Sequence, residues 1–221
     1  MDRIRIRDLF DLSHTRAVSL LNRFEYPWEA LAGIGDAIRE IGASLGEAYE
    51  CRGDDVYIAR SASVAPGAVI IGPCVIGERT EVRPGAYIRG NVLVGDDAVV
   101  GNSTELKNCI LFDGVQVPHY NYVGDSILGY RAHMGAGAVT SNVKGDKQEV
   151  IIRGEAAYAS GRRKVGAMIG DGGEVGCNAV LNPGTVLGRS VQVYPLSCVR
   201  GVIPERSIVK GERGVFPKDV R

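Results

Sequence analysis

Several features that would assign this chain to a function class are absent from its sequence. Its 26 basic side chains are balanced by 26 acidic ones, so net charge gives no reason to expect nucleic acid or an anionic membrane as a partner. No apolar run approaches the roughly 18 residues that a membrane-spanning helix needs. The N-terminus, MDRIRIRDLF, lacks the apolar core of a signal peptide. We therefore expect a cytoplasmic protein with no nucleic-acid or membrane partner.

Cysteine and histidine are also scarce. The five cysteines are odd in number and never occur as a Cys-x-x-Cys pair, which favours reduced thiols over a disulfide framework or a zinc site. The histidines are His14, His119 and His133. A zinc hydratase would need three convergent histidines, and His14 lies outside the repetitive part of the chain. We rank that alternative low and expect no metal to be required.

A six-residue repeat dominates what is present. An aliphatic residue returns at every sixth position, and a small or compact side chain stands two residues before each one. A fixed internal period of this kind is typical of repeat architectures, in which sites form on outer faces or between copies. The aliphatic positions are Ile58, Val64, Ile70, Ile76, Val82, Ile88, Val94, Val100 and Leu106.

The period is interrupted twice. It falters near Phe112–Val123 and resumes at Leu128. Residues 143–165 break it again and are rich in basic side chains, so we interpret them as a protruding excursion. The register then returns from Ile169 to Val199, close to the C-terminus.

A hexapeptide period fits a three-faced prism with three short strands and three turns in each 18-residue coil. The aliphatic residue points inward, and strand pairing stacks the coils about 4.8 Å apart. Residues 18 apart then lie one above another on the same face. We therefore predict a mainly β protein in which residues 53–221 form a parallel β-helix. Spacing alone does not fix the hand of the coil, because parallel crossovers are usually right-handed.

Residues 1–52 follow a different rule. Apolar residues recur there at spacings of three and four, which predicts an amphipathic helix starting beside Pro27, with a shorter helix around Thr15–Arg23. We interpret this segment as a cap or packing flange for the repeat. The glycines of LAGIGDAIRE interrupt the helical stripe instead of following a strand, so no nucleotidyl-transfer loop is expected. The stripe comprises Trp28, Leu31, Ile34, Ile38, Ile41 and Leu45.

The segment GNSTELKN, residues 101–108, carries the first candidate site residues. Glu105 and Lys107 flank inward Leu106, so both point outward on one strand. Most exposed pairs of this kind are only a solvated face. Arg89, however, lies one 18-residue coil before Lys107, and two stacked cations repel each other unless an anion lies beside them. A phosphate-binding pair is therefore predicted.

The segment PHYNYVGDS, residues 118–126, places a histidine where the period falters. A lone histidine is more often structural than catalytic. Tyr120, Tyr122 and the nearby Glu105 nevertheless make a pocket wall plausible around His119. An imidazole in such a wall can accept a proton at neutral pH.

Two further segments contain candidate binding groups. In HMGAGAVTSN, residues 133–142, the glycines allow close backbone approach, and Asn142 offers both a donor and an acceptor. In SGRRKVGAMIGD, residues 160–171, the basic run is either surface charge or a clamp on phosphates.

Together these segments resemble a known family. GNSTELKN, PHYNYVGDS and HMGAGAVTSN are similar to the C-terminal acetyltransferase domain of the bifunctional bacterial enzyme that makes UDP-N-acetylglucosamine. SGRRKVGAMIG is closer to archaeal sugar-1-phosphate nucleotidylyltransferases with a similar acetyltransferase domain. The resemblance covers about Val56–Val209, without the pyrophosphorylase domain, and implies the left-handed β-helix of hexapeptide-repeat acyltransferases.

The resemblance implies roles for residues around the acceptor sugar. His119 would be the general base, while Tyr122 and Lys107 would bind the sugar phosphate. Asn142 would lie at the amine or the sugar, with Lys147 as a further candidate, and His133 stands in the acceptor pocket where the family usually has asparagine. The family's phosphate-binding arginine corresponds to Arg83 by its local RPGA motif and to Arg89 by its spacing from Lys107, and we favour Arg89.

The resemblance also implies a cofactor site and an assembly. In the family, acetyl-CoA lies between adjacent prisms of a homotrimer. The nearest matches to its contacts are Ala138, Arg162, Arg163, Lys164, Cys177 and Pro195.

The leading hypothesis is an acetyl-CoA-dependent N-acetyltransferase that acts on an amino-sugar 1-phosphate. His119 would take the proton of the attacking amine and Glu105 would orient the imidazole. The alternative is a non-catalytic module with the same fold that binds a sugar phosphate or a nucleotide sugar. Neither hypothesis identifies the acceptor sugar.

Overall fold

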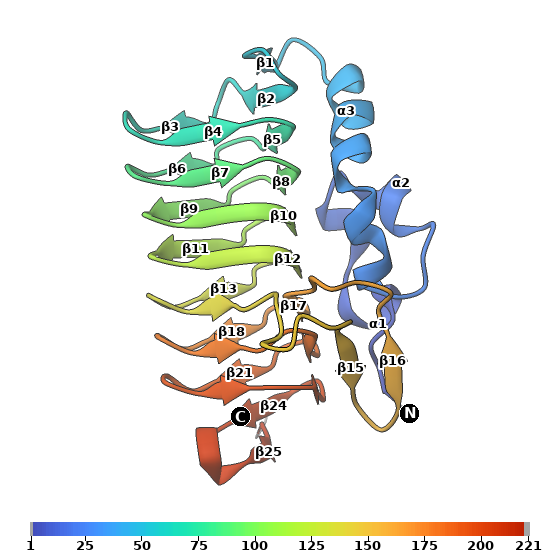
Figure 1. Cartoon of the computed structure of the whole chain (residues 1–221). Coiled ribbons are helices and arrows are strands. Elements are labelled where there is room, and N and C mark those ends of the chain that lie inside the picture. The colour runs from blue at the N-terminus through green and yellow to red at the C-terminus, as the bar shows by residue number, and fades with distance from the viewer. Residues whose placement is uncertain (1, 219–221) are drawn as a thin grey trace.

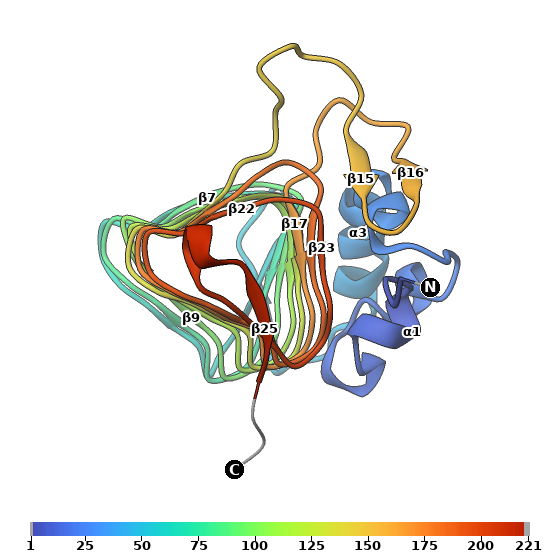
Figure 2. The same ribbon diagram turned by 90° about the horizontal axis from the view of Figure 1, so that it is seen from below.

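The chain folds into a triangular prism with a helical segment along one side (Figures 1 and 2). This structure is a computed structural model that describes residues 2–218. Between residues 56 and 209 the backbone winds through three faces, each a parallel sheet that gains one strand per coil. In Figure 2 the chain passes clockwise from face to face while it advances toward the viewer, so the coil is left-handed. The predicted left-handed parallel β-helix is confirmed.

The helix face is the one covered by the N-terminal helices. Two long strands, β10 (Glu105–Leu111) and β12 (Tyr122–Leu128), contribute their C-terminal halves to it because both bend around an edge of the prism. Its other strands are β2 (Val56–Ala59), β5 (Cys74–Ile76), β8 (Val92–Val94), β17 (Ala167–Ile169), β20 (Thr185–Leu187) and β23 (Val202–Ile203).

The front face is turned toward the viewer in Figure 1. The N-terminal halves of β10 and β12 belong to it, and they pair with β7 on one side and β14 on the other. Its other strands are β4 (Val69–Ile71), β7 (Tyr87–Arg89), β14 (Val139–Thr140), β19 (Val180–Leu181) and β22 (Cys198–Val199).

The back face is a separate sheet that closes the triangle. Its strands are β3 (Ser63–Val64), β6 (Glu81–Val82), β9 (Val99–Asn102), β11 (Gln116–His119), β13 (His133–Met134), β18 (Glu174–Val175), β21 (Gln192–Val193) and β24 (Ser207–Val209).

The predicted inward positions fill the prism. Ile88, Val100 and Leu106 are fully buried, and burial of such side chains is worth about 1.5–3 kcal/mol each. Only Val64 and Ile70 among the nine aliphatic positions are half-buried, because β3 and β4 are edge strands of the stack.

A change in coil length explains where the sequence period falters. Leu106 still pairs with Ile88, which preserves the 18-residue spacing, but Cys109 pairs with Val92, one residue closer in sequence. The turn before β8 contains two residues with positive φ, Gly90 and Asn91, whereas Asn108 is the single such residue of the same turn one coil later. The shortened turn shifts the hexapeptide register for the coils that follow.

Each edge of the prism is a column of tight turns. The front–back corner joins the back face to the front face, and the front–helix corner joins the front face to the helix face. Many of these turns contain a residue with a left-handed backbone, a conformation that asparagine and aspartate tolerate better than most residues. Examples are Tyr120 at the front–back corner and Asn108 and Asp125 at the front–helix corner.

The N-terminal segment packs along the helix face. Backbone amides of Asp113 and Asp171, at turns of the prism, donate to the carbonyls of His14 and Leu9 over 3.0 Å each. In helix α3, Gly42 lies so close to Tyr57 that a Cβ would overlap the phenol ring, at 2.2 Å. The helical elements are α1 (Ile6–Leu9), η1 (Leu12–His14), α2 (Val18–Leu21), η2 (Pro27–Ala32) and α3 (Ile34–Ser44).

Two details of the expected segment are corrected. The stripe from Trp28 to Leu45 forms a 3₁₀ helix and an α-helix that meet at Gly33, where a Cβ would approach Leu20 to 2.7 Å. The segment is a flange rather than an end cap. The ends of the stack are covered by antiparallel strands, β1 (Tyr49–Cys51) beside β2 and β25 (Val215–Pro217) beside β24, and the turn η3 (Gly211–Arg213) precedes β25.

The predicted excursion leaves and rejoins the prism at a narrow neck. The amide of Val165 donates to the carbonyl of Asn142 over 3.1 Å. Within the excursion, β15 (Ile151–Arg153) and β16 (Ala157–Ala159) form an antiparallel hairpin beside the helices. Val150 and Ile152 are fully buried, so the excursion is packed onto the molecule. No helix among residues 2–218 is long and apolar enough to cross a membrane.

Candidate active site

A buried aspartate organises the front–helix corner. Asp125 is 3% exposed. Its carboxylate accepts hydrogen bonds from the side-chain amides of Asn108, at 2.8 Å, and Asn142, at 2.6 Å. The ammonium of Lys107 lies 3.8 Å from the same carboxylate. Such a network holds Lys107 and Asn142 in place before any ligand binds.

Tyr122 completes this network from the front face. Its hydroxyl accepts a hydrogen bond from the Asn142 amide at 3.2 Å. A Cβ on Gly124 would lie 2.4 Å from that hydroxyl, so the glycine lets the phenol fold over its own strand. Burial raises the pKa of Tyr122, and the phenol is therefore neutral and able to donate to a ligand.

The predicted cation pair is present on the front face. The register of β7 and β10 brings Lys107 into line with Arg89, one coil apart. Each cation already has a carboxylate beside it, because Arg89 donates to Glu105 over 2.6 Å and Lys107 faces Asp125. Repulsion between Arg89 and Lys107 is therefore already offset, and the two side chains can lie close together without a bound anion. The pair remains a candidate phosphate site.

This ion pair also corrects the expected role of Glu105. Its carboxylate is hydrogen-bonded to Arg89, and no hydrogen bond or ion pair between the Glu105 and His119 side chains occurs within residues 2–218. Glu105 projects from β10 on the front face, whereas His119 ends β11 on the back face.

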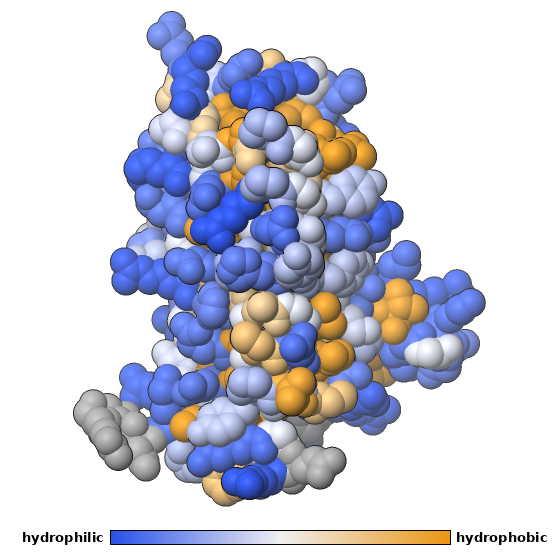
Figure 3. All heavy atoms as spheres, turned by 90° about the vertical axis from the view of Figure 1, so that its left-hand side faces the viewer, coloured by the Kyte–Doolittle hydropathy of each residue, from blue (hydrophilic) through white to orange (hydrophobic). Residues whose placement is uncertain are grey.

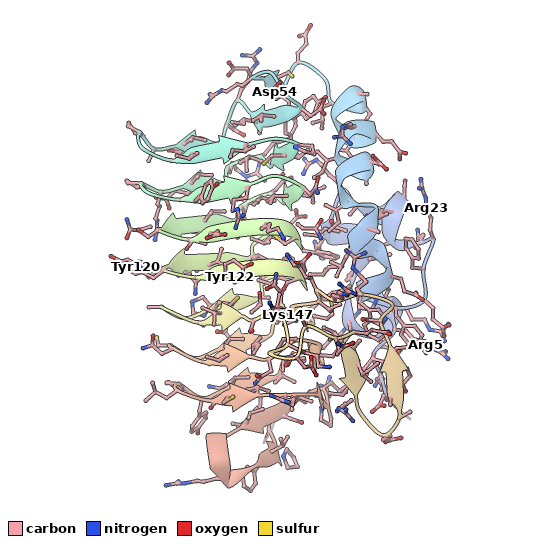
Figure 4. The ribbon with its side chains drawn as sticks, in the orientation of Figure 1. Arg5, Arg23, Asp54, Tyr120, Tyr122 and Lys147 are labelled. Atoms are coloured by element: carbon pink, nitrogen blue, oxygen red, sulfur yellow. The ribbon has the colours of Figure 1, made fainter. Side chains whose placement is uncertain are left out.

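Asn121 holds the turn that carries His119. Asn121 is 2% exposed, and its side-chain oxygen accepts from the His119 amide at 3.1 Å. Its side-chain amide donates to the carbonyls of Gly135, at 2.8 Å, and Ala138, at 3.1 Å. The His119 side chain itself is exposed, and its ring has no hydrogen-bond partner in the described part of the chain. Figure 4 shows neighbouring Tyr120 projecting outward at this corner.

Stacked turns bring two predicted cofactor contacts into line with His119. Along the front–back corner, Gly137 N–H donates to the His119 carbonyl, Asn178 N–H to Ala136 and Leu196 N–H to Cys177. Cys177 therefore lies two coils from His119, about 10 Å away, and Pro195 follows one coil later. Both are exposed. Ala138, which is also predicted to contact the cofactor, is fully buried.

His133 is not brought to the acceptor residues of the same chain. It projects from β13 on the back face, where its Nδ1 lies 2.8 Å from a carboxylate oxygen of Glu174. This pair borders an open depression of about 370 Å³ that Cys177 and Pro195 also line. Because β13 and the front face meet only at the corner, His133 lies on the side of the predicted cofactor contacts.

Two other candidates lie away from the network. Arg83 follows β6 of the back face, and its guanidinium bonds Glu81 at 3.0 Å. Arg89, on the face that carries Lys107, is therefore the better placed arginine. Lys147 is exposed in a turn of the excursion. Neither Arg83 nor Lys147 lines the depression that Lys107 borders.

The basic run of the excursion lies beside Lys107 instead of the cofactor contacts. Arg162, Arg163 and Lys164 line an open depression of about 590 Å³ together with Lys107 and Asp125. Within one chain they lie apart from Cys177 and Pro195, because the neck of the excursion returns at the front–helix corner. Their predicted grouping at a cofactor site between adjacent prisms stays a prediction.

Asn121 and Asp125 were both missed by reasoning from sequence. Both stand inside PHYNYVGDS, next to residues that were chosen. The available signal was an aspartate or asparagine in a turn where the period falters. The role of each residue depends on its burial, which cannot be read from the sequence. The three histidines are also separated: His14 stacks on Tyr130 with ring centroids 3.6 Å apart. No group of three His, Cys, Asp or Glu suited to a metal occurs among residues 2–218.

Fold and site together define a hexapeptide-repeat β-helix protein with a polar site along one edge of the prism. Residues 70–212 match the family model described as the GMPPB C-terminal domain, and the chain belongs to this family. The resemblance read from the sequence is confirmed.

Similar curated proteins are longer than this chain. "Bifunctional protein GlmU" of Methanococcus maripaludis is 32% identical over 203 residues, which cover 89% of this chain and 49% of that protein. "Bifunctional sugar-1-phosphate nucleotidylyltransferase/acetyltransferase" of Sulfurisphaera tokodaii is 34% identical over 114 residues, 51% of this chain and 27% of the relative. The chain thus spans about half of their length or less.

A solved structure with a similar fold is the acetyltransferase domain of PglB from Neisseria gonorrhoeae in complex with acetyl coenzyme A. It is 20% identical with a TM-score of 0.40, and the match covers 81% of this chain and 62% of that one.

Proposed function

We propose that this protein transfers an acetyl group from acetyl-CoA to the amine of an amino-sugar phosphate. The observation that carries the proposal is the polar network of Lys107, Asn108, Tyr122, Asp125 and Asn142, assembled around one buried carboxylate beside a corner that presents His119. Family membership and the curated relative of Sulfurisphaera tokodaii, which is named as an acetyltransferase, support it.

The acceptor would bind on the front face. Lys107 and Arg89 would hold its phosphate, since ammonium and guanidinium groups form strong charge-assisted bonds to phosphate oxygens. Asn142 and Tyr122 would bind sugar hydroxyls through a fixed amide and phenol. Asp125 would act on the substrate only through Asn142 and Lys107, which it positions.

Acetyl-CoA would lie along the front–back corner. The turns of His119, Cys177 and Pro195 are stacked there, and an extended thiol arm running along the column would bring its thioester to His119. Exposed backbone N–H groups of these turns could bind the developing oxyanion.

The transfer needs no covalent enzyme intermediate. His119 removes a proton from the attacking amine as the nitrogen forms its bond to the thioester carbonyl carbon. The tetrahedral intermediate collapses, the carbon–sulfur bond breaks, and the proton passes from the imidazole to the leaving CoA thiolate. The products are the N-acetylated sugar and free CoA thiol.

A homotrimer is part of this proposal. The front–back corner presents large apolar side chains to solvent, with Leu196 79% and Tyr120 65% exposed. Figure 3, which looks onto this corner, shows hydrophobic areas at two levels of the prism separated by a hydrophilic band. A neighbouring copy would cover this surface and close the cofactor groove, since the helix face is already occupied by the protein's own flange.

The test is release of CoA thiol over a panel of amino-sugar phosphates, with wild type, His119→Ala and Gln116→Ala as a control on the same strand. We expect His119→Ala to lower kcat by about 10²–10⁴-fold and Gln116→Ala to leave it within about twofold. Turnover by His119→Ala equal to wild type would remove His119 from the mechanism. Acetyl-CoA binding, measured by calorimetry, would be absent from a non-catalytic sugar-phosphate module.

A further inference from the structure

The depression beside Lys107 is built by three separate parts of the chain. Lys107, Asn108 and Asp125 supply one side from the front–helix corner, and residues 161–164 of the excursion supply the opposite rim. The N-terminal flange closes the third side with Leu31 and Ala32, next to Asn91. Its volume of about 590 Å³ is within the range of pockets that hold drug-sized ligands.

The rim carries cationic charge that the protein does not neutralise. Arg162, Arg163 and Lys164 have no carboxylate partner among residues 2–218, whereas Arg79 pairs with Asp97 and Arg89 with Glu105 on the prism. The Nε atom of Arg162 is buried and lacks any hydrogen-bond partner within the described residues. A buried guanidinium N–H without an acceptor costs free energy that a bound anion would recover.

This charge exceeds what a single phosphate requires. Lys107 and Arg89, the proposed partners of the sugar phosphate, lie on the front-face side of the depression. The three further cations lie beyond Lys107, on the side of the flange. Ala32 is exposed there, so a small apolar surface adjoins the cationic rim. Such a sequence of surfaces fits a sugar, two phosphates and a nucleoside in that order.

We infer that the acceptor is a nucleoside diphosphate amino sugar, with its nucleoside-side phosphate on Arg162, Arg163 and Lys164 and its nucleoside against the flange at Ala32. The inference rests on the proposed function for the identity of the acceptor. It gives residues 1–52 a part in substrate binding in addition to packing. Arginine and lysine at this rim are the side chains that bind phosphate oxygens most strongly.

The experiment measures binding and turnover separately in the full chain. Calorimetry determines the Kd of UDP, as the diphosphate probe, and of glucosamine 1-phosphate. Thiol release determines KM for acetyl-CoA and for UDP-linked and monophosphate amino sugars. The test variant is Arg163→Ala/Lys164→Ala, which alters two exposed side chains. The matched control is Lys147→Ala/Arg153→Ala, which removes the same charges from exposed positions of the same excursion.

We expect the test variant to weaken UDP binding by about tenfold or more, equivalent to about 1.4 kcal/mol, while Kd for glucosamine 1-phosphate and KM for acetyl-CoA change by less than about twofold. The control should resemble wild type. Equal losses of affinity for UDP and glucosamine 1-phosphate in the test variant would overturn the inference. A rise only in KM for acetyl-CoA would also overturn it. A further outcome separates the two proposals: the wild-type protein acetylates no amino sugar, but the test variant still binds UDP more weakly than wild type. In that case the diphosphate site stands and the proposed function fails.

Discussion

The two ends of the front face differ in how much of a site they contain within one chain. At the front–helix corner, the buried carboxylate of Asp125 accepts hydrogen bonds from two side-chain amides and faces the ammonium of Lys107. At the front–back corner, the His119 backbone is fixed by Asn121 while its imidazole is exposed to solvent. Under the proposed function, the comparison teaches that the acceptor site is preorganised in the monomer, whereas the reacting centre would require a second copy to exclude water.

Removing Asp125 should have the largest effect on this comparison. Asp125→Ala leaves Asn108, Asn142 and Lys107 without their common acceptor, and loss of one member of a buried ionic network costs about 3–5 kcal/mol. We expect this fall in the free energy of unfolding, measured by urea denaturation, together with loss of acceptor binding.

Asp97→Ala is the matched control. Asp97 also has a left-handed backbone at a turn, but its side chain is 58% exposed in its pair with Arg79, so its loss should cost about 1 kcal/mol or less. If Asp125→Ala and Asp97→Ala lowered the free energy of unfolding equally, the hydrogen bonds of Asp125 would contribute no stability beyond that of an ordinary turn.

Asn121→Ala should have an intermediate effect at the opposite corner. The substitution removes the partners of the His119 amide and the Ala138 carbonyl and one of the two donors to the Gly135 carbonyl. Buried groups without partners cost about 1–3 kcal/mol. Because the His119 turn loosens while the acceptor network is untouched, kcat should fall with little change in KM for the acceptor.

Asn102→Ala, one coil away on the same corner, provides the comparison. Its side chain makes one exposed bond to the Pro84 carbonyl, and we expect less than about 0.5 kcal/mol of destabilisation. A rise in acceptor KM in Asn121→Ala without any fall in kcat would contradict separate roles for the two corners.

Thiol labelling should give the smallest effect, a protection rather than a loss. Cys177 and Cys198 are exposed, and burial raises the pKa of the Cys74 and Cys109 thiols, so those two should stay unlabelled. Alkylation requires an accessible thiol. If acetyl-CoA lies along the front–back corner, it covers Cys177 and should slow alkylation of that thiol about twofold or more. Mass spectrometry of each cysteine peptide measures this, with Cys198 as the internal reference. Protection of Cys198 alone would place the cofactor on the front face.

The repeat was readable from sequence because sterics enforce it at every coil. Ile88, Val100 and Leu106 point inward wherever the prism continues, and Arg89 could be aligned with Lys107 from spacing alone. The shortened turn at Asn108 could not be read in this way. Loss of one residue at a corner changes the register of later coils without changing the residue types that fill them.

Side-chain partners were less predictable than positions. Glu105 was assigned to His119 because both lie near in sequence, yet the carboxylate reaches Arg89 on the adjacent strand. Arg162 and Lys164 were grouped with Cys177, although the neck of the excursion returns them to Lys107. Such contacts depend on the corner of the prism at which a loop leaves. The path of the folded backbone determines that corner, and the local sequence pattern does not show it.

The most direct measurement is a crystal structure of the protein with CoA and an amino-sugar phosphate bound together. The account predicts the phosphate on Arg89 and Lys107, the CoA thiol arm along the column of His119 and Cys177, and the sugar amine within hydrogen-bond distance of the His119 imidazole. A sugar amine held instead beside His133 and Glu174, with His119 in solvent, would contradict it.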